Sequence, residues 1–163
     1  VFGTITPHHL HVTSTDLLGN GLRPEYYCMP VVQSNKDRAA LIQAAVSNNP
    51  KFFAGTDSAP HLNGAKYASI GCAGCFTGLH AMELYAEIFE KYGGKDWERR
   101  LENFTSHYGA ECYDLPLNRG RLTLRRQEWE IPHAIRSSAP NRTHSKYAIR
   151  PFRAGQKLRF KVC

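Results

Sequence analysis

One stretch of the chain places a carboxylate and an imidazole directly after an apolar strand. Residues 52–54 are apolar, Asp57 follows three residues later, and His61 comes four residues after that. In barrel enzymes, polar residues at the C-terminal end of a strand carry the chemistry. Asp57 could bind a metal ion or transfer a proton, or simply cap a turn. His61 could bind an anion, although an isolated histidine is more often a surface or packing residue. One Asp and one His cannot build a hydrolytic metal site, so we expect this chain to be part of something larger.

A second candidate site is the segment Cys72-Ala73-Gly74-Cys75. Its two cysteines have the spacing of zinc ligands, but a structural zinc site needs four ligands and the sequence has no second pair of this kind. The interpretation that we favour concerns the small residues Ala73 and Gly74. Small side chains let backbone N–H groups approach a ligand closely, and such groups can hold a carboxylate.

Three histidines, His8, His9 and His11, form a third candidate. At the end of a strand, His9 and His11 would point the same way, as in some metal sites. No further motif supports a metal site here. We therefore expect these histidines to be rim residues that lie near the functional site and not in it.

The order of predicted elements indicates a βαβα arrangement. Apolar periodicity and turn signals predict strands at 2–10, 51–56, 121–129 and 157–162, helices at 36–47, 79–92, 96–104 and 107–113, and loops at 58–77 and 137–145. The first two strands cannot close a barrel, which needs eight. We therefore expect an apolar edge that another polypeptide must cover.

Composition excludes several classes of protein. The sequence contains no run of 18 apolar residues, which a transmembrane helix would need, and it shows no secretory signal. We therefore expect a cytoplasmic protein. Its five cysteines would then be free thiols. No P-loop, dinucleotide-binding glycine motif or serine-nucleophile motif is present.

Residues 1–90 carry 5 Lys/Arg and 7 Asp/Glu, whereas residues 91–163 carry 16 and 7. This asymmetry could indicate an anionic partner, but the basic residues are spread along the tail and favour an ordinary solvated surface.

Taken together, these motifs resemble dihydroorotase, in the shorter form that occurs as a separate enzyme. The segments that carry the resemblance are TITPHHL (4–10), RP (23–24), YCMP (27–30), GTDSAPH (55–61), GCAGC (71–75), FE (89–90) and YDLP (113–116). The match is to the C-terminal portion of that family. It implies an α/β chain that forms the C-terminal part of a (β/α)8 TIM-barrel metal-dependent amidohydrolase. Residues 1–118 would supply the last barrel strands and the active-site loop, and residues 119–163 a basic C-terminal extension with short strands that packs on the barrel.

The resemblance also implies a reaction and roles for residues. The family uses two zinc ions to interconvert N-carbamoyl-L-aspartate and L-dihydroorotate in pyrimidine biosynthesis. Asp57 would bind one zinc ion and move a proton between the attacking hydroxide and the ring nitrogen. His61 would bind the substrate carboxylate together with the backbone of the Ala73–Gly74 loop. The backbone of Met29 would hydrogen-bond the ring.

This sequence departs from the family in one major respect. The histidine pair of the first barrel strand, the carboxylated lysine and two further histidine ligands have no counterpart here. We therefore expect the chain alone to be inactive, and to act with an N-terminal portion of the same protein, as a homodimer. Two alternatives stay open at this point. A related cyclic amidohydrolase such as a hydantoinase would lack the carboxylate-binding set, and a basic nucleic-acid-binding module would bind in a salt-sensitive way.

Overall fold

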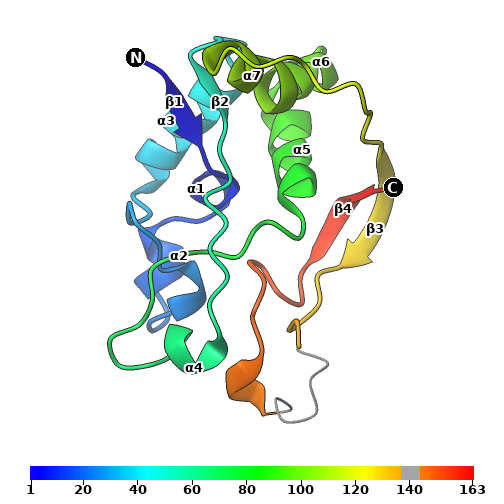
Figure 1. Ribbon diagram of the computed structural model, residues 1–163. Coiled ribbons are helices and arrows are strands. Elements are labelled where there is room, and N and C mark those ends of the chain that lie inside the picture. Colours follow the sequence, from blue (N-terminus) through cyan, green and yellow to red (C-terminus); the bar gives the residue numbers. More distant parts are fainter. Residues whose placement is uncertain (137–143) are drawn as a thin grey trace.

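Two short parallel strands organise the first part of the chain in the computed structural model, which describes residues 1–136 and 144–163. β1 (Gly3–Ile5) pairs with β2 (Phe52–Ala54), with Gly3 opposite Phe52 (Figure 1). The chain between them forms α1 (Pro7–His11), α2 (Ser14–Leu18), the 3₁₀ turn η1 (Pro24–Tyr26) and α3 (Asn35–Val46). This arrangement confirms the predicted strand–helix–strand unit.

α3 begins where the sequence predicts, because Ser34 and Asp37 form a capping box. The Ser34 hydroxyl oxygen accepts a hydrogen bond from the Asp37 backbone N–H, and the Asp37 carboxylate accepts one from the Ser34 backbone N–H. These two bonds satisfy N–H groups that a helix start otherwise leaves unpaired.

The predicted strand over residues 2–10 is wrong beyond Ile5. The Thr6 side chain accepts a hydrogen bond from the His9 backbone N–H and Pro7 occupies the first helical turn, so the chain coils into α1. As a result, His9 and His11 do not share one face of a strand. The His9 Nε2 atom lies 2.8 Å from the Pro30 carbonyl oxygen, whereas His11 Nε2 donates to the Leu84 carbonyl oxygen at 3.0 Å.

Helices follow β2. The expected loop over 58–77 contains the short helix α4 (Asn63–Lys66), and the predicted helix over 79–92 is confirmed as α5 (Ala81–Tyr92). α6 (Trp97–Glu102), the π-helical turn η2 (Asn103–His107) and α7 (Tyr108–Cys112) form one nearly continuous run. The Tyr85 hydroxyl donates to the Ile5 carbonyl oxygen at 2.7 Å, which fixes α5 against β1. None of the described helices is long and apolar enough to cross a membrane.

The tail forms an antiparallel hairpin that packs on α5. The two strands predicted in the tail are present as β3 (Leu124–Glu130) and β4 (Lys157–Val162). They pair with each other, which the sequence analysis did not predict, and the 3₁₀ turn η3 (Ser145–Tyr147) lies between them. Leu158 and Phe160 are buried, and the Trp129 indole N–H donates to the Phe160 carbonyl oxygen at 2.7 Å. Most of the loop expected at 137–145 lies outside the described residues.

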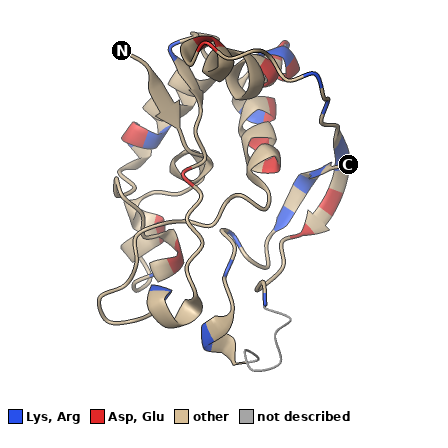
Figure 2. Ribbon diagram, in the orientation of Figure 1, with Lys and Arg blue, Asp and Glu red and all other residues tan. Residues whose placement is uncertain are grey.

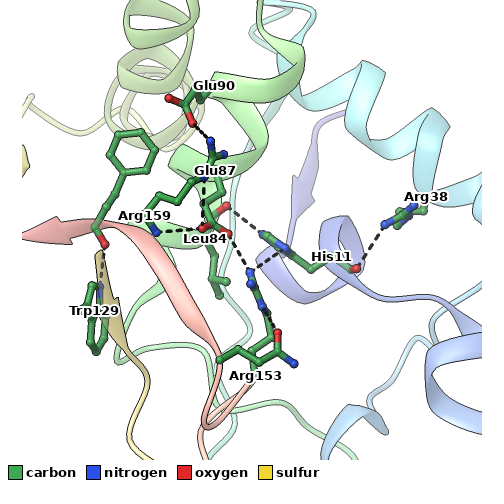
Figure 3. A network of polar contacts seen from close by, with 10 residues as sticks. His11, Arg38, Leu84, Glu87, Glu90, Trp129, Arg153 and Arg159 are labelled. Carbon is green, nitrogen blue, oxygen red and sulfur yellow. Dashed lines mark hydrogen bonds and ion pairs between the residues drawn. The ribbon is translucent and has the colours of Figure 1, made fainter. Parts of the chain in front are cut away.

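Acidic side chains of α5 hold the basic tail in place. The Glu87 carboxylate accepts hydrogen bonds from Arg153 Nη1 at 2.8 Å and from the Arg159 backbone N–H at 3.1 Å, and Glu90 pairs with Arg159 Nη1 at 2.6 Å (Figure 3). Arg126 also pairs with Glu90. Figure 2 shows the acidic positions of α5 opposite basic positions of β4. Part of the positive charge of the tail is therefore used within the fold.

His11 is the neutral member of this network. Arg153 Nη1 donates to His11 Nδ1 at 3.3 Å while His11 Nε2 donates to Leu84, so a second ring proton would face a guanidinium. Burial, together with the charge of Arg153, lowers the pKa of His11 to about 4. An unfolded histidine titrates near about 6.5, so between these two values the unfolded chain binds more protons.

We predict that the free energy of unfolding is constant above pH about 6.5 with respect to His11 and falls as the pH drops toward 4. The variant His11→Gln keeps an N–H for Leu84 and an oxygen for Arg153 but cannot titrate. Urea unfolding gives the free energy of unfolding at pH 7 and at pH 5. Its decrease between these two pH values should be smaller in His11→Gln than in the unmodified chain, by on the order of 2 kcal/mol. Equal losses in both proteins would show that His11 does not contribute to the pH dependence.

Candidate functional site

Asp57 lies just beyond the C-terminal end of β2, where the backbone turns sharply. Its φ angle is 42°, in the left-handed region that Asp tolerates better than most residues. Gly55 comes just before it, and a Cβ atom there would lie 2.5 Å from the Thr4 Cβ atom. The strand therefore ends in close contact with its neighbour, and the exposed Asp57 is available to a ligand at this end of the sheet.

The segment after Asp57 is joined to the Cys72–Cys75 loop. Ser58 and Cys75 form an isolated parallel bridge, and the Ala59 N–H donates to the Cys75 carbonyl oxygen at 3.0 Å. The Ser58 hydroxyl oxygen accepts hydrogen bonds from the backbone N–H groups of Thr77 and Gly78. These contacts bring residues 57–61 and 71–75 together, although the sequence separates them.

The structure brings together His61, Ala73 and Gly74, three of the residues to which the resemblance assigns substrate binding. The His61 Nε2 atom donates to the Ala73 carbonyl oxygen at 3.0 Å, which leaves Nδ1 for a ligand. Gly74 has a φ angle of 140°, and a Cβ atom there would lie 2.4 Å from the Ala59 Cβ atom and 3.0 Å from His61 Nε2. Its N–H already donates to the Tyr27 carbonyl oxygen at 2.9 Å. The contribution of Gly74 is therefore the space that its missing side chain leaves.

Lys66 is the residue of this region that the sequence analysis missed. Its ammonium group is buried and donates to three carbonyl oxygens, those of Tyr27 and Cys72 at 2.8 Å and that of Gly74 at 2.6 Å. Burial lowers the pKa of this amine. A lone lysine in a long polar loop ordinarily indicates a solvated side chain, so composition contains no signal for this role.

Met29 follows Tyr27 by two residues, and its side chain is 60% exposed. Tyr27 contacts both Lys66 and Gly74 through its carbonyl oxygen, so the same bonds that shape the Ala73–Gly74 loop also position the segment that carries Met29. Arg150, from the tail, lines a small recess with His61 and Gly74. The predicted substrate-binding residues therefore lie on segments that contact one another.

Two buried thiols lie beneath these segments. A hydrogen bond from Cys75 and the neighbouring imidazoles of His8 and His9 lower the pKa of Cys28, and the same contact raises the pKa of Cys75. The contact with Cys28 in turn raises the pKa of His9. The expectation that His8 is a rim residue is wrong, because its side chain is fully buried. Coiling of α1 turns His8 inward, where a strand would have alternated it outward.

The described residues contain one group of three potential metal ligands, and Asp57 is not a member of it. That group is His8, His9 and Cys28, whereas the Cys72 and Cys75 pair is not part of any such group. Asp57 is an exposed carboxylate at a strand end, of the chemical type that binds a hard or borderline cation. Among the described residues, Asp57 therefore offers a single candidate ligand and belongs to no group of three.

The known proteins to which this chain is similar are dihydroorotases. No protein-family model matches the chain. Curated relatives named dihydroorotase include one from Acaryochloris marina, 46% identical over 98% of this chain, and one from Cupriavidus necator, 47% identical over 99%. The chain spans 43% and 44% of the length of these two relatives.

The solved structures that superpose on this chain are also dihydroorotases. A Saccharomyces cerevisiae dihydroorotase in complex with 5-fluoroorotic acid superposes over 100% of this chain with a TM-score of 0.84 and 34% sequence identity. A dihydroorotase from Campylobacter jejuni superposes over 99% with a TM-score of 0.82 and 30% identity. This chain covers 43% and 44% of those two chains. The chain is therefore similar along its whole length to the C-terminal portion of dihydroorotases, and is an α/β piece of that fold.

Proposed function

We propose that this chain is the C-terminal part of a zinc-dependent dihydroorotase, which reversibly cyclises N-carbamoyl-L-aspartate to L-dihydroorotate with loss of water. The observation that carries the proposal is the assembly of Asp57, His61 and the Ala73–Gly74 loop at one end of β2 through the bridge between Ser58 and Cys75. Sequence identity of 46–47% to curated dihydroorotases supports it.

In this proposal β1 and β2 are the seventh and eighth strands of a (β/α)8 barrel. Each has one neighbour among the described residues, so each leaves one edge of backbone groups unpaired. Phe2 is 56% exposed and stacks near Phe53 with ring centroids 6.4 Å apart. Six further strands from an N-terminal portion would pair with these edges and cover this apolar surface.

Asp57 would be the one residue of this chain that binds the zinc pair. When bound, the two ions supply Lewis-acid activation of the carbonyl carbon that is attacked. In the hydrolytic direction, Asp57 takes the proton of the attacking water and delivers it to the ring nitrogen as the C–N bond breaks. In the cyclisation direction, it removes a proton from the ureido nitrogen as the C–N bond forms and water leaves.

The substrate carboxylate would bind beside His61. With Nε2 held by the Ala73 carbonyl oxygen, a protonated Nδ1 donates to the carboxylate, and the Ala73 N–H is the nearby backbone donor. Gly74 keeps this space open, and the Met29 backbone would hydrogen-bond the ring. Arg150 of the tail lines the recess that His61 occupies, together with Glu25, so one guanidinium of the tail lies near the proposed carboxylate site.

A hydantoinase-like activity is the second candidate, and the predicted carboxylate-binding set argues against it. The nucleic-acid-binding alternative loses support because Arg126, Arg153 and Arg159 pair with glutamates of α5. A cytoplasmic location and a homodimer stay predictions.

The proposal is tested by a chimera in which this chain replaces the corresponding C-terminal 44% of the Cupriavidus necator dihydroorotase. We predict dihydroorotate hydrolysis by the chimera and none by this chain alone. Asp57→Asn in the chimera should lower kcat by about 10²–10⁴-fold, because the proton transfer is lost. A folded chimera that hydrolyses hydantoins but not dihydroorotate, or full activity of Asp57→Asn, would contradict the proposal.

The role of Gly74 gives a separate prediction. Gly74→Ala in the chimera would place a methyl group against Ala59 and the His61 ring, so kcat/KM for dihydroorotate should fall by about 100-fold, mainly through KM. Gly120→Ala is the matched control, since a Cβ atom there meets nothing within 4 Å. Steady-state kinetics in which both variants behave alike would remove Gly74 from the binding site.

A further inference from the structure

Three potential metal ligands converge beneath the segment that carries Met29. One ring nitrogen each from His8 and His9 and the Cys28 sulfur all lie within 4.8 Å of one another. The two imidazoles come from α1, their ring centroids are 4.7 Å apart, and Cys28 lies just after η1. None of these three residues has a role in the function proposed above.

His8 is the unusual member of the group. Its side chain has no exposed surface, and within the described structure neither ring nitrogen has a hydrogen-bond partner. A buried polar group without a partner loses its hydrogen bonds to water and gains none in return, and native proteins rarely tolerate it. An imidazole next to a second imidazole and a thiol has an obvious alternative partner, which is a metal ion.

We propose that His8, His9 and Cys28 supply three ligands to a divalent cation of the zinc class, with a solvent molecule as the fourth, and that this cation would join α1 to the segment that bears Met29. Two imidazoles and a thiolate are the donor set that Zn²⁺ prefers in proteins. The cation would satisfy His8 and would fix two parts of the chain that lie 20 residues apart.

The surroundings of His9 suit a metal ligand. Its Nδ1 atom lies 2.6 Å from the Thr6 hydroxyl oxygen, which can accept a hydrogen bond from an Nδ1–H group and so leave the Nε2 lone pair for a metal ion. Nε2 is 3.9 Å from the Cys28 sulfur.

The Pro30 carbonyl oxygen identifies the two protons that metal binding would displace, those on His9 Nε2 and on the Cys28 sulfur. It lies 2.8 Å from His9 Nε2 and 3.3 Å from the Cys28 sulfur, so without metal it accepts hydrogen bonds from this pair. Metal binding replaces protons at these atoms and releases them to solvent.

The test uses this chain, stripped of metal and kept reduced, and titrates it with Co²⁺ as a spectroscopic substitute for Zn²⁺. We expect one equivalent to produce a sulfur-to-cobalt charge-transfer band and the visible bands of a tetrahedral site, and Zn²⁺ to abolish both. Cys28→Ser should remove the charge-transfer band, and His8→Gln should weaken binding by at least about 10-fold. Cys72→Ser is the matched control and should leave the spectrum unchanged.

A second measurement needs no variant and so does not depend on how a variant folds. In the unmodified chain, Zn²⁺ should slow alkylation of Cys28 and leave that of the exposed Cys163 unchanged, as read by peptide mass spectrometry. Absence of both the cobalt band and the protection would overturn the proposal. So would a band that survives Cys28→Ser and disappears in Cys72→Ser.

Discussion

The arrangement of the candidate site depends on the hydrogen bonds that the Lys66 ammonium group donates to backbone carbonyl oxygens. Three carbonyl oxygens, from Tyr27, Cys72 and Gly74, point at one buried cation. Three aligned carbonyl dipoles repel one another, and an isolated buried ammonium is strongly disfavoured. Together they form charge-assisted hydrogen bonds that use all three donors of the lysine. This single contact brings the Met29 segment and the Ala73–Gly74 loop to one place.

The tail contacts the segments of the candidate site through backbone hydrogen bonds. The Asn63 N–H donates to the Ala148 carbonyl oxygen at 2.8 Å, and the Phe152 N–H donates to the Phe76 carbonyl oxygen at 2.8 Å. The same tail continues into β4, which the acidic face of α5 holds through Glu83, Glu87 and Glu90. The positive charge of the tail thus serves the packing of the hairpin on α5, whereas backbone hydrogen bonds join the tail to the segments near His61. Arg150 brings one cation to the recess itself.

Local signals predicted the regular elements well. Apolar periodicity and turn signals are properties of neighbouring residues, and they placed α3, α5, β3 and β4 within three residues of their observed bounds. The strand over 2–10 failed because the Thr6-Pro7 helix start outweighed the apolar run. In the candidate site, the sequence motifs identified His61, Ala73 and Gly74, which the structure brings together.

Other features were beyond prediction because they depend on contacts distant in sequence. Lys66 reaches a carbonyl 39 residues away, and Glu87 reaches an arginine 66 residues away. His8 was expected at the rim because no further motif supported a metal site there, whereas the helical geometry of α1 turns it into the core.

The most direct test of this account is amide hydrogen exchange at residues 71–75 in Lys66→Met compared with the unmodified chain. Methionine fills a similar volume but donates no hydrogen bond, so the loop carbonyls lose their shared partner. The account predicts that the Gly74 N–H, bonded to Tyr27, exchanges at least about 10-fold faster in Lys66→Met while α5 keeps its protection. Unchanged exchange at Gly74 would contradict the claim that Lys66 organises the site.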